Sequence, residues 1–492
     1  MSSDLPILRP SETCWRIERS DRLRVILDAA DYFATIRKAV PLARHSVLMI
    51  GWDFDTRIEL EPHAPPSDTP NRLGEFLNWV VESNPELRIH VLKWDMDWLP
   101  SLGRGSTPLA ILDWMTDDRI RFKLDAAHPV ASAHHQKIVV IDDTLAFCGG
   151  IDMTGDRWDT PDHLDDHPLR RRPSTRRRYG PWHDVTTAVN GDAARALGDL
   201  ARERWKAATG EDLAPPPPRP PLWPEGLETT MRSVDVAVSR TLPPHGEREG
   251  VHEIEALYLA AIAGTRRNLY IESQYFASRK VAEAMVARLR EEDPPEIVVV
   301  NPLTADGWLE EQVMGSSRAM LLQMLRAADH CDRFRMYTPV TFKGDPIYVH
   351  AKVLVMDDHL LRVGSSNLNN RSMGFDTECD LSVEVGPETP ELAETIAGLR
   401  TMLLAEHLGV EPAAFEAAVA RKGGSLIGGI EALRGPGRSL VPFVPPELNG
   451  LQETVLADND LLDPERPSHM WGRRIRRKAA RQWLPFFGRV AE

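Results

Sequence analysis

Apolar residues follow two alternating patterns along this chain, and the same order of patterns occurs twice. Short apolar runs predict buried strands, whereas apolar residues three or four positions apart predict amphipathic helices. The first series is strand 46–55, helix 71–82, strand 88–94, helix 107–115 and strand 119–125, and the second is strand 268–276, helix 279–291, strand 296–302, helix 317–329 and strand 333–339. This repetition predicts an α/β fold of two similar α/β/α lobes from a tandem duplication, each with a mixed, largely parallel sheet.

A proline-rich segment separates the two series. Residues 211–226, EDLAPPPPRPPLWPEG, can form neither a helix nor a central strand, and we expect a stiff, extended linker. The predicted organisation is an N-terminal lobe over 1–210, this linker, a C-terminal lobe over 227–410 and an extension over 411–492. We expect the lobes to pack so that their repeated motifs meet at the interface.

One motif is present in both series. The stretch HHQKIVVIDDTLAFCGGID begins at His134, and VHAKVLVMDDHLLRVGSSN begins at Val349. Every shared position of the second copy lies 215 residues after its counterpart. The matched positions are His135, Lys137, Asp142, Gly149 and Asp152 in the first copy, and His350, Lys352, Asp357, Gly364 and Asn367 in the second.

The residues that follow each lysine predict a strand, so the histidine and the lysine lie on one face of it. The aspartate that ends the strand is an odd number of residues away, so its side chain points to the opposite face from the histidine and the lysine. If the turn of each hairpin has two residues, His135 faces Asp152 and Lys137 faces Gly150. In the second copy the same register places His350 opposite Asn367 and Lys352 opposite Ser365.

Two such sets suit the chemistry of a phosphate ester. Two lysines and an asparagine form a cationic cradle for an anionic tetrahedral group. Two histidines can divide the work, because one can attack phosphorus while the other protonates the leaving oxygen. A single His-x-Lys on a strand would be interpreted as two exposed polar residues without a specific function. Two copies at matching offsets argue against coincidence.

The paired motifs, His-x-Lys-x4-Asp at 135–142 and at 350–357, resemble the signature of the phospholipase D superfamily. The flanking sequences GGIDMTGDRWDTPDH and YIESQYF are similar to the phosphatidylcholine-cleaving, eukaryotic-like type. The resemblance covers roughly residues 12–410. It implies two fused lobes around one active site, and a covalent phosphohistidine that water or an alcohol resolves.

The resemblance also implies a role for individual residues. It implies that His135 is the nucleophile and His350 the general acid, with Glu378 orienting His135 and Asp184 orienting His350. Ordinary acids at strand edges are the alternative for both carboxylates. For binding the substrate phosphate we expect Lys137, Lys352, Asn367 and Ser365; for a structural role we expect Asp142, Asp357, Gly149, Gly364 and Asp152.

Asp152 departs from the pattern, because the second copy has Asn367 at the matching position. A carboxylate there would repel phosphate. We expect it to be turned away or paired with a base such as Arg157. The site is expected to contain no metal ligand and to need no cofactor for its chemistry, although stimulation by Ca²⁺ remains open.

The insert at 160–180 has two interpretations. Its acidic and histidine-rich part could form a divalent-ion site, but a solvated loop is the favoured interpretation; the residues are Asp162, His163, Asp165, Asp166 and His167. Its six arginines, at 170–172 and 176–178, either line the mouth of the site and attract anionic headgroups or keep the loop soluble.

The tail from His469 is basic and contains regularly spaced apolar residues. Trp471, Ile475, Ala479 and Trp483 lie four apart among seven basic residues. This pattern suits a helix that lies on an anionic membrane surface, with a docked or disordered tail as the alternative.

Composition narrows the class of protein. A net charge of −14 argues against a nucleic-acid partner. The four cysteines lack metal or disulfide spacing and are expected to be free thiols. The absence of an apparent signal peptide or membrane span predicts a cytoplasmic protein, a monomer that binds the phospholipid membrane surface peripherally through its tail.

The function predicted from these features is hydrolysis, or transphosphatidylation, of glycerophospholipids to phosphatidic acid plus headgroup. A cardiolipin-synthase-like phosphatidyltransferase is the alternative, and a nuclease or another phosphodiesterase of the superfamily ranks below it. A non-catalytic lipid-binding protein would have lost part of the paired motif, and both copies are intact.

Overall fold

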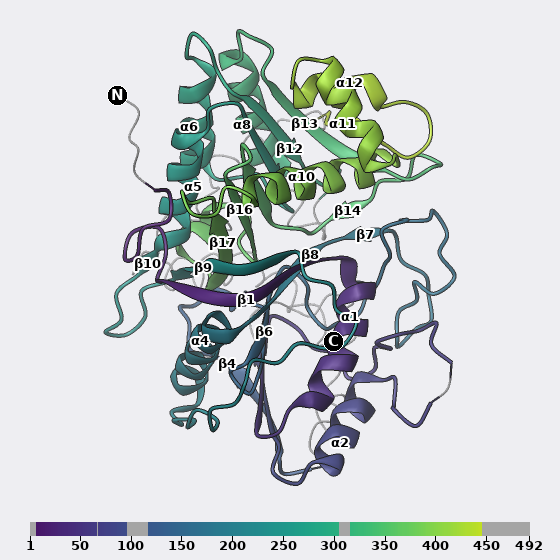
Figure 1. Ribbon diagram of the computed structural model, residues 1–492, viewed down its shortest axis with the longest axis vertical. Coiled ribbons are helices and arrows are strands. Elements are labelled where there is room, and N and C mark those ends of the chain that lie inside the picture. The colour runs from purple at the N-terminus through teal and green to yellow at the C-terminus, as the bar shows by residue number, and fades with distance from the viewer. Residues whose placement is uncertain (1–5, 66, 96–116, 305–314, 445–492) are drawn as a thin grey trace, which may run out of the picture.

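The fold is mixed α/β, as the sequence predicts, but the sheets of the two lobes are joined into one large sheet (Figure 1). The computed structural model describes residues 6–65, 67–95, 117–304 and 315–444. The predicted helix at 107–115 and the basic tail lie outside these residues. No helix among the described residues has the length and apolar character needed to cross a bilayer.

The first part of the chain forms the lower half of the molecule in Figure 1. Its strands are β1 (Arg16–Leu27), β2 (Ser46–Gly51), β3 (Arg88–Trp94), β4 (Ile120–Asp125), β5 (Ile138–Ile141), β6 (Leu145–Gly149), β7 (Trp182–His183) and β8 (Val185–Asn190). Its helices are α1 (Asp28–Ala39), α2 (Leu73–Ser83) and α4 (Gly191–Thr209), and a short 3-10 helix, η1 (Val40–Leu42), follows α1.

The second part forms the upper half. Its strands are β9 (Met231–Leu242), β10 (Val251–His252), β11 (Asn268–Glu272), β12 (Glu296–Val300), β13 (Phe334–Val340), β14 (Tyr348–Val349), β15 (Val353–Met356), β16 (Leu360–Gly364), β17 (Glu378–Glu384) and β18 (Ser439–Pro442). Its helices are α5 (Glu253–Gly264), α6 (Arg279–Leu289), α8 (Ser316–Ala328), α9 (Asn370–Gly374), α10 (Leu392–Leu408), α11 (Pro412–Arg421) and α12 (Leu426–Leu433). Residues 211–230, which join the two parts, contain no helix or strand.

The two halves of the sheet share two long strands. The order is β18-β13-β12-β11-β15-β16-β17-β9-β1-β8-β6-β5-β2-β3-β4. The first segment of β1, from Arg16, pairs with β9, and its last segment, to Leu27, pairs with β8. Because different segments of β1 pair with the two halves, β1 and β9 carry the sheet from one lobe into the other (Figure 1).

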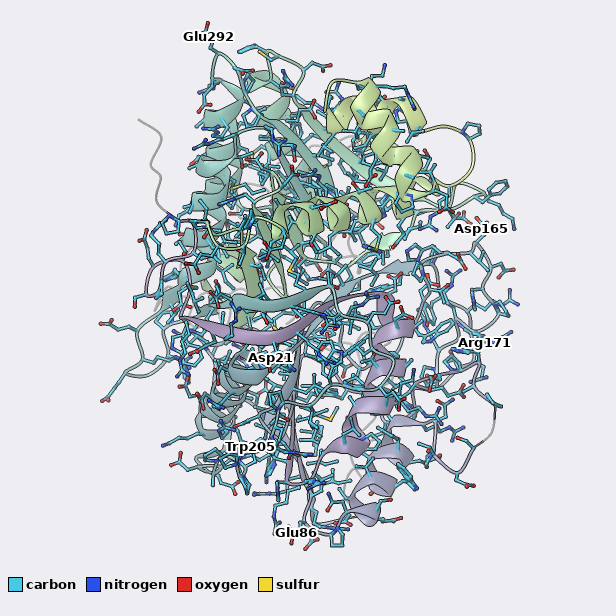
Figure 2. The ribbon with its side chains drawn as sticks, in the orientation of Figure 1. Asp21, Glu86, Asp165, Arg171, Trp205 and Glu292 are labelled. Carbon is cyan, nitrogen blue, oxygen red and sulfur yellow. The ribbon has the colours of Figure 1, made fainter. Side chains whose placement is uncertain are left out.

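In both lobes the topology places the motif at the edge of the sheet where the parallel strands end. Strands β2, β3 and β4 are parallel, as are β11, β12 and β13. Strand β5 runs antiparallel to β2 and β15 antiparallel to β11, so each motif histidine lies at the carboxyl ends of the parallel strands. The short strands β7 and β14 pair with each other across the lobes, next to this edge. Asp165 and Arg171, in the segment that leads to β7, lie at the same margin of the molecule (Figure 2).

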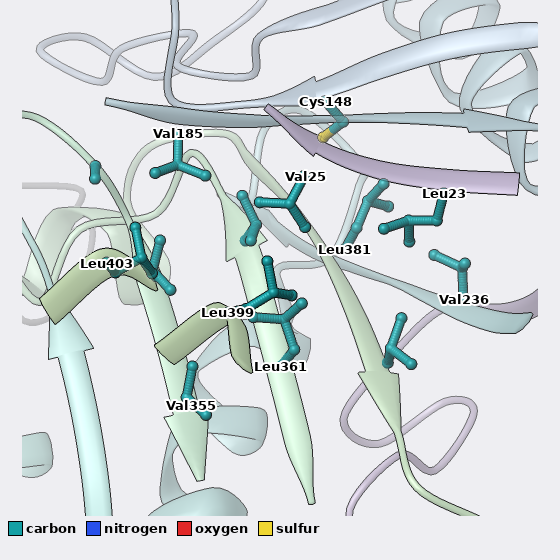
Figure 3. Packing of buried hydrophobic residues seen from close by; sticks show 14 of the residues in the cluster. Leu23, Val25, Cys148, Val185, Val236, Val355, Leu361, Leu381, Leu399 and Leu403 are labelled. Carbon is teal, nitrogen blue, oxygen red and sulfur yellow. The ribbon is translucent and has the colours of Figure 1, made fainter. Parts of the chain in front are cut away.

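A continuous apolar core joins the lobes. One cluster contains Val25 and Val185 from the first part and Leu361 and Leu381 from the second (Figure 3). Cys148 belongs to this cluster, and its thiol lies 3.6 Å from the carbonyl oxygen of Cys379. All four cysteines are free, and three of them are buried.

The predicted two-residue turn of each hairpin is wrong. Ile141 pairs with Leu145, and Met356 pairs with Leu360, so each turn has three residues. The physical reason is the aspartate that opens each turn. Asp142 and Asp357 have φ values of 49° and 53°, in the left-handed region.

Each of these aspartates fastens its hairpin to the neighbouring parallel strand. The Asp142 carboxylate accepts hydrogen bonds from three successive backbone N–H groups, at residues 44–46, where β2 begins. Asp357 accepts three from residues 266–268, where β11 begins. The repeated aspartate therefore has a structural task, because it satisfies backbone donors that no strand partner reaches.

Gly149 and Gly364 allow the close approach of the next strand. A Cβ atom on Gly149 would lie 2.4 Å from the Cα atom of Thr186, and one on Gly364 would lie 2.6 Å from the Cα atom of Asp380. Any side chain at either position would force the strands apart.

We expect Asp142→Ala to lower the free energy of unfolding by about 1–3 kcal/mol, because three part-buried N–H groups lose their acceptor. Denaturant titration followed by tryptophan fluorescence measures this loss. Asp21→Ala, at an exposed position of β1, is the matched control and should change the stability by less than about 0.5 kcal/mol. Equal stability of the two variants would contradict the structural role.

Candidate active site

Each motif histidine is held by backbone from the opposite lobe. The N–H of His135 donates to the carbonyl oxygen of Thr377 at 3.0 Å, and the N–H of His350 donates to that of His183 at 2.8 Å. Strands β7 and β14 also pair with each other across the two lobes. The two halves of the site are therefore assembled only when the lobes are packed together.

His135 contacts a buried carboxylate. Its Nδ1 lies 3.0 Å from one oxygen of Glu378 and 3.1 Å from the other. The hydroxyls of Ser365 and Ser372 donate to the same carboxylate at 2.5 and 2.6 Å. Burial raises the pKa of Glu378 to about 8. Burial, together with the charges of the two motif lysines, lowers the pKa of His135.

The consequence is a pair that shares one proton at neutral pH. The proton lies between Glu378 and Nδ1 of His135, which leaves Nε2 of the ring with a lone pair. His135 is part-buried, with 16% of its side chain exposed, so this nitrogen can meet a substrate.

His350 has the reciprocal arrangement. Its Nδ1 lies 2.6 Å from Oδ2 of Asp184. The other oxygen of Asp184 accepts from the N–H of Val185 at 2.8 Å. Burial raises the pKa of Asp184 to about 6. Burial, Lys352 and Arg157 lower the pKa of His350.

The lysines differ between the two halves. Nζ of Lys137 lies 3.1 Å from Oδ2 of Asp152, so the carboxylate that replaces an asparagine neutralises this ammonium. Oδ1 of Asp152 accepts from the N–H of Trp52 at 3.0 Å. The base that pairs with Asp152 is therefore Lys137, whereas Arg157 lies over the ring of Trp182 at 4.2 Å.

Lys352 has no such counter-ion within hydrogen-bonding distance among the described residues. It donates to the carbonyl oxygen of His350 and lies 3.4 Å from Oε1 of Gln274. Burial lowers its pKa to about 7. A phosphate anion in this half of the site would find an ammonium group that lacks a compensating carboxylate.

Asn367 and Ser365 occupy different positions in the second half. The Nδ2 group of Asn367 lies 3.5 Å from Oε1 of Gln274, next to Lys352. The hydroxyl of Ser365 donates to Glu378 and accepts from the N–H of Cys379, so it supports the carboxylate that holds His135. Contact of either side chain with phosphate stays a prediction.

Gln274 was missed at the sequence level. Its Oε1 faces both Lys352 and Asn367, and its Nε2 donates to the hydroxyls of Tyr275 and Tyr348 at 3.0 and 2.9 Å. The stretch YIESQYF was the available signal, but it gave no indication of which side chain would face the lysine.

A second buried cluster lies directly behind the site. His183, which accepts the N–H of His350 on its carbonyl, belongs to a group whose donor atoms lie within 4.8 Å of one another: Asp28, His163, His183 and Glu406. Two imidazoles and two carboxylates form a donor set that suits a divalent cation. Asp159 and Glu272 hold the outer ring nitrogens of His163 and His183 at 3.0 and 2.9 Å, as second-layer carboxylates often do for metal-binding histidines.

The insert is largely exposed, as the solvated-loop interpretation expects, but His163 is an exception. His163 is fully buried, and the carboxylates of Asp28, Asp159 and Glu406 outweigh the effect of burial and raise its pKa to about 9. The other named residues of the insert, Asp162, Asp165, Asp166 and His167, do not belong to this cluster.

Comparison with known proteins agrees with the repeated motifs. Residues 115–215 match the family model described as "Phospholipase D", and residues 258–399 match "Cardiolipin synthase, PLD-like domain". "Phospholipase D A" of Dictyostelium discoideum is 24% identical over 79% of this chain and 36% of that protein. "Phospholipase D alpha 1" of Carica papaya is 24% identical over 76% of this chain and 63% of that protein. The chain thus spans less than two thirds of the length of these relatives.

A solved structure has a similar fold. The phosphatidylserine synthase of Haemophilus influenzae Rd KW20 superposes with a TM-score of 0.51 over 83% of this chain and 95% of that chain, at 13% sequence identity. At this identity the similarity concerns the fold alone.

The raised pKa of Glu378 predicts a pH-dependent difference in stability. In the folded protein Glu378 keeps a proton that it loses near pH 4.5 in the unfolded chain, so its contribution to the stability falls as the pH rises towards 8. Glu378→Gln removes this dependence. We expect its free energy of unfolding relative to the parent to rise by at most about 1.4 kcal/mol per pH unit across this window.

Denaturant titrations at several pH values between 4.5 and 8.5 measure the difference. Glu388→Gln, at an exposed position beyond β17, is the control and should keep a constant difference from the parent. A constant difference for Glu378→Gln would contradict the assignment of the shared proton.

Proposed function

Because the chain belongs to the phospholipase D superfamily, we propose that it is a phosphodiesterase that cleaves glycerophospholipids to phosphatidic acid and a free headgroup. The observation that carries the proposal is the reciprocal pairing of each motif histidine with a carboxylate from the opposite lobe, at 3.0 Å for His135–Glu378 and 2.6 Å for His350–Asp184. This pairing leaves both Nε2 atoms for the substrate.

In the proposed mechanism, Nε2 of His135 attacks phosphorus and forms a P–N bond. The bond between phosphorus and the headgroup oxygen breaks, and that oxygen takes a proton from Nε2 of His350. The neutral ring of His350 then removes a proton from water or an alcohol, which attacks phosphorus and breaks the P–N bond. Atoms and protons balance over the two steps, and both rings return to their starting states.

The surrounding charges support this division of roles. His350 must carry a proton on Nε2 when the substrate is bound, although its pKa is lowered in the free protein. An anionic phosphodiester beside it favours the imidazolium form. Lys137, Lys352 and Asn367 donate to the phosphate oxygens, whose charge increases in the transition state. Catalysis in this superfamily needs no cofactor.

A phosphatidyltransferase is the second candidate. The match of residues 258–399 to a model described as "Cardiolipin synthase, PLD-like domain" favours it. The same covalent intermediate would serve either enzyme, and only the nucleophile that resolves it differs. We further propose a cytoplasmic monomer that binds the membrane surface peripherally and takes no nucleic acid.

The first test concerns the two histidines. His135→Ala should lose all incorporation of phosphate into the protein, whereas His350→Ala should still form a phosphoenzyme from a substrate with an activated leaving group such as p-nitrophenol. Because the two rings act together, turnover of an ordinary phospholipid should fall roughly 1,000-fold or more in each variant.

Rapid-quench trapping with a ³²P-labelled substrate measures the phosphoenzyme. His330→Ala, at an exposed position after α8, should behave as the parent. Normal turnover by either motif variant would exclude the two-histidine mechanism.

The second test uses an alcohol as the acceptor. A phosphohistidine can be resolved by any nucleophile that reaches phosphorus, so added ethanol should give phosphatidylethanol at the expense of phosphatidic acid. Mass spectrometry of the lipid products measures the ratio. Formation of a transfer product with no detectable hydrolysis, even without alcohol, would favour the transferase instead.

A further inference from the structure

Several exposed apolar side chains lie at the sheet edge that carries the two histidines. Four large ones lie in the loops that follow β4, β6, β12 and β13, and the exposed fractions are 67% for Val130, 50% for Leu164, 42% for Leu303 and 78% for Phe342. Val130 precedes His135 by five residues, and Phe342 precedes His350 by eight. Equivalent loops of the two lobes thus present an apolar tip beside the same site.

Two of these tips belong to one continuous surface. The carboxylate of Asp165, next to Leu164, accepts from the hydroxyl of Thr341 and from the N–H of Lys343 at 2.9 Å. These contacts fix the Leu164 loop of one lobe against the Phe342 loop of the other. Asp165 lies at the margin of the molecule beyond β7 and β14 (Figure 2).

The same surface is basic, although the protein as a whole is acidic. Residues 160–180 carry six arginines and three aspartates, in a chain whose net charge is −14. Arg170 is buried on Asp159, and Arg172, Arg176 and Arg178 pair with carboxylates. Arg171 donates to the carbonyl oxygens of Pro168 and Arg176, and among the described residues neither Arg171 nor Arg177 has a carboxylate partner. Lys343 is exposed beside Phe342.

We propose that this surface, which we call the docking rim (Leu164, Phe342, Arg171, Arg177 and Lys343), binds the face of an anionic phospholipid bilayer. Leu164 and Phe342 insert among the acyl chains, while the three cations lie at the level of the phosphates. Apolar tips beside cations without carboxylate partners match the two layers of an anionic bilayer face, its acyl chains and its phosphates. The proposal rests on the proposed function for its biological meaning, because docking would bring the site to its substrate.

The experiment measures binding of the full chain to sedimented vesicles, of phosphatidylcholine alone or mixed with phosphatidylglycerol. We expect Leu164→Ser combined with Phe342→Ser to weaken binding to both kinds of vesicle by roughly 100-fold. Arg171→Glu combined with Arg177→Glu should weaken binding only where phosphatidylglycerol is present, by roughly tenfold or more, and should reduce its salt dependence, because Lys343 remains.

The matched controls lie at the opposite edge of the sheet. Leu42, 39% exposed, precedes the amino end of β2, and Arg290 is exposed between α6 and the amino end of β12. Leu42→Ser and Arg290→Glu should bind as the parent. All variants should hydrolyse a monomeric short-chain substrate at the parental rate, because no rim residue contacts the histidines; Arg171 is partly exposed and the other four are exposed.

Parental binding by both rim variants would overturn the proposal, as would an equal loss in the controls. The proposal would also be overturned if the rim bound a soluble protein partner and did not bind vesicles. The measurements need no turnover and can be repeated with His135→Ala. Rim-dependent binding by a protein that cleaves no phospholipid would therefore refute the proposed function and leave the docking rim standing.

Discussion

The site depends on an exchange between lobes of groups that are expensive to bury. Glu378 lies on the second lobe and holds His135 of the first, while Asp184 lies on the first and holds His350 of the second. A buried carboxylate without such a partner would destabilise the fold. The two pairs across the lobes thus stabilise the packing of the lobes. The same pairs set the orientation of both rings and the position of the protons.

The duplication is symmetrical in its framework and asymmetrical in its charges. Asp142 and Asp357 make the same three backbone contacts, and Gly149 and Gly364 allow the same close approach of the next strand. In contrast, Lys137 pairs with Asp152, whereas Lys352 faces the neutral amide of Gln274. Because an anion is bound best where the cation is not already neutralised, we infer that the second half carries more of the phosphate binding.

The sequence was sufficient for the fold class and for the elements around the motifs, because the apolar periodicity and the 215-residue offset are local or repeated signals. It could not give the turn of the hairpins, since a left-handed Asp142 that caps a distant strand leaves no local trace. The pairing of Glu378 with His135 was reached only through the family pattern. The cluster of Asp28, His163, His183 and Glu406 was missed because its members lie in four separate parts of the chain.

The long strands β1 and β9 make the two lobes mutually dependent as folding units. β1 belongs by sequence to the first half, but its leading segment finds its hydrogen-bond partner on β9 in the second. A nick within 211–226 would therefore yield two fragments that each expose a long unpaired strand edge. Such fragments have a ready template for rejoining with each other, and equally for pairing with their own kind. A gene for one half alone would thus encode a protein predisposed to self-association, which is the state from which a fused, two-lobed chain can arise.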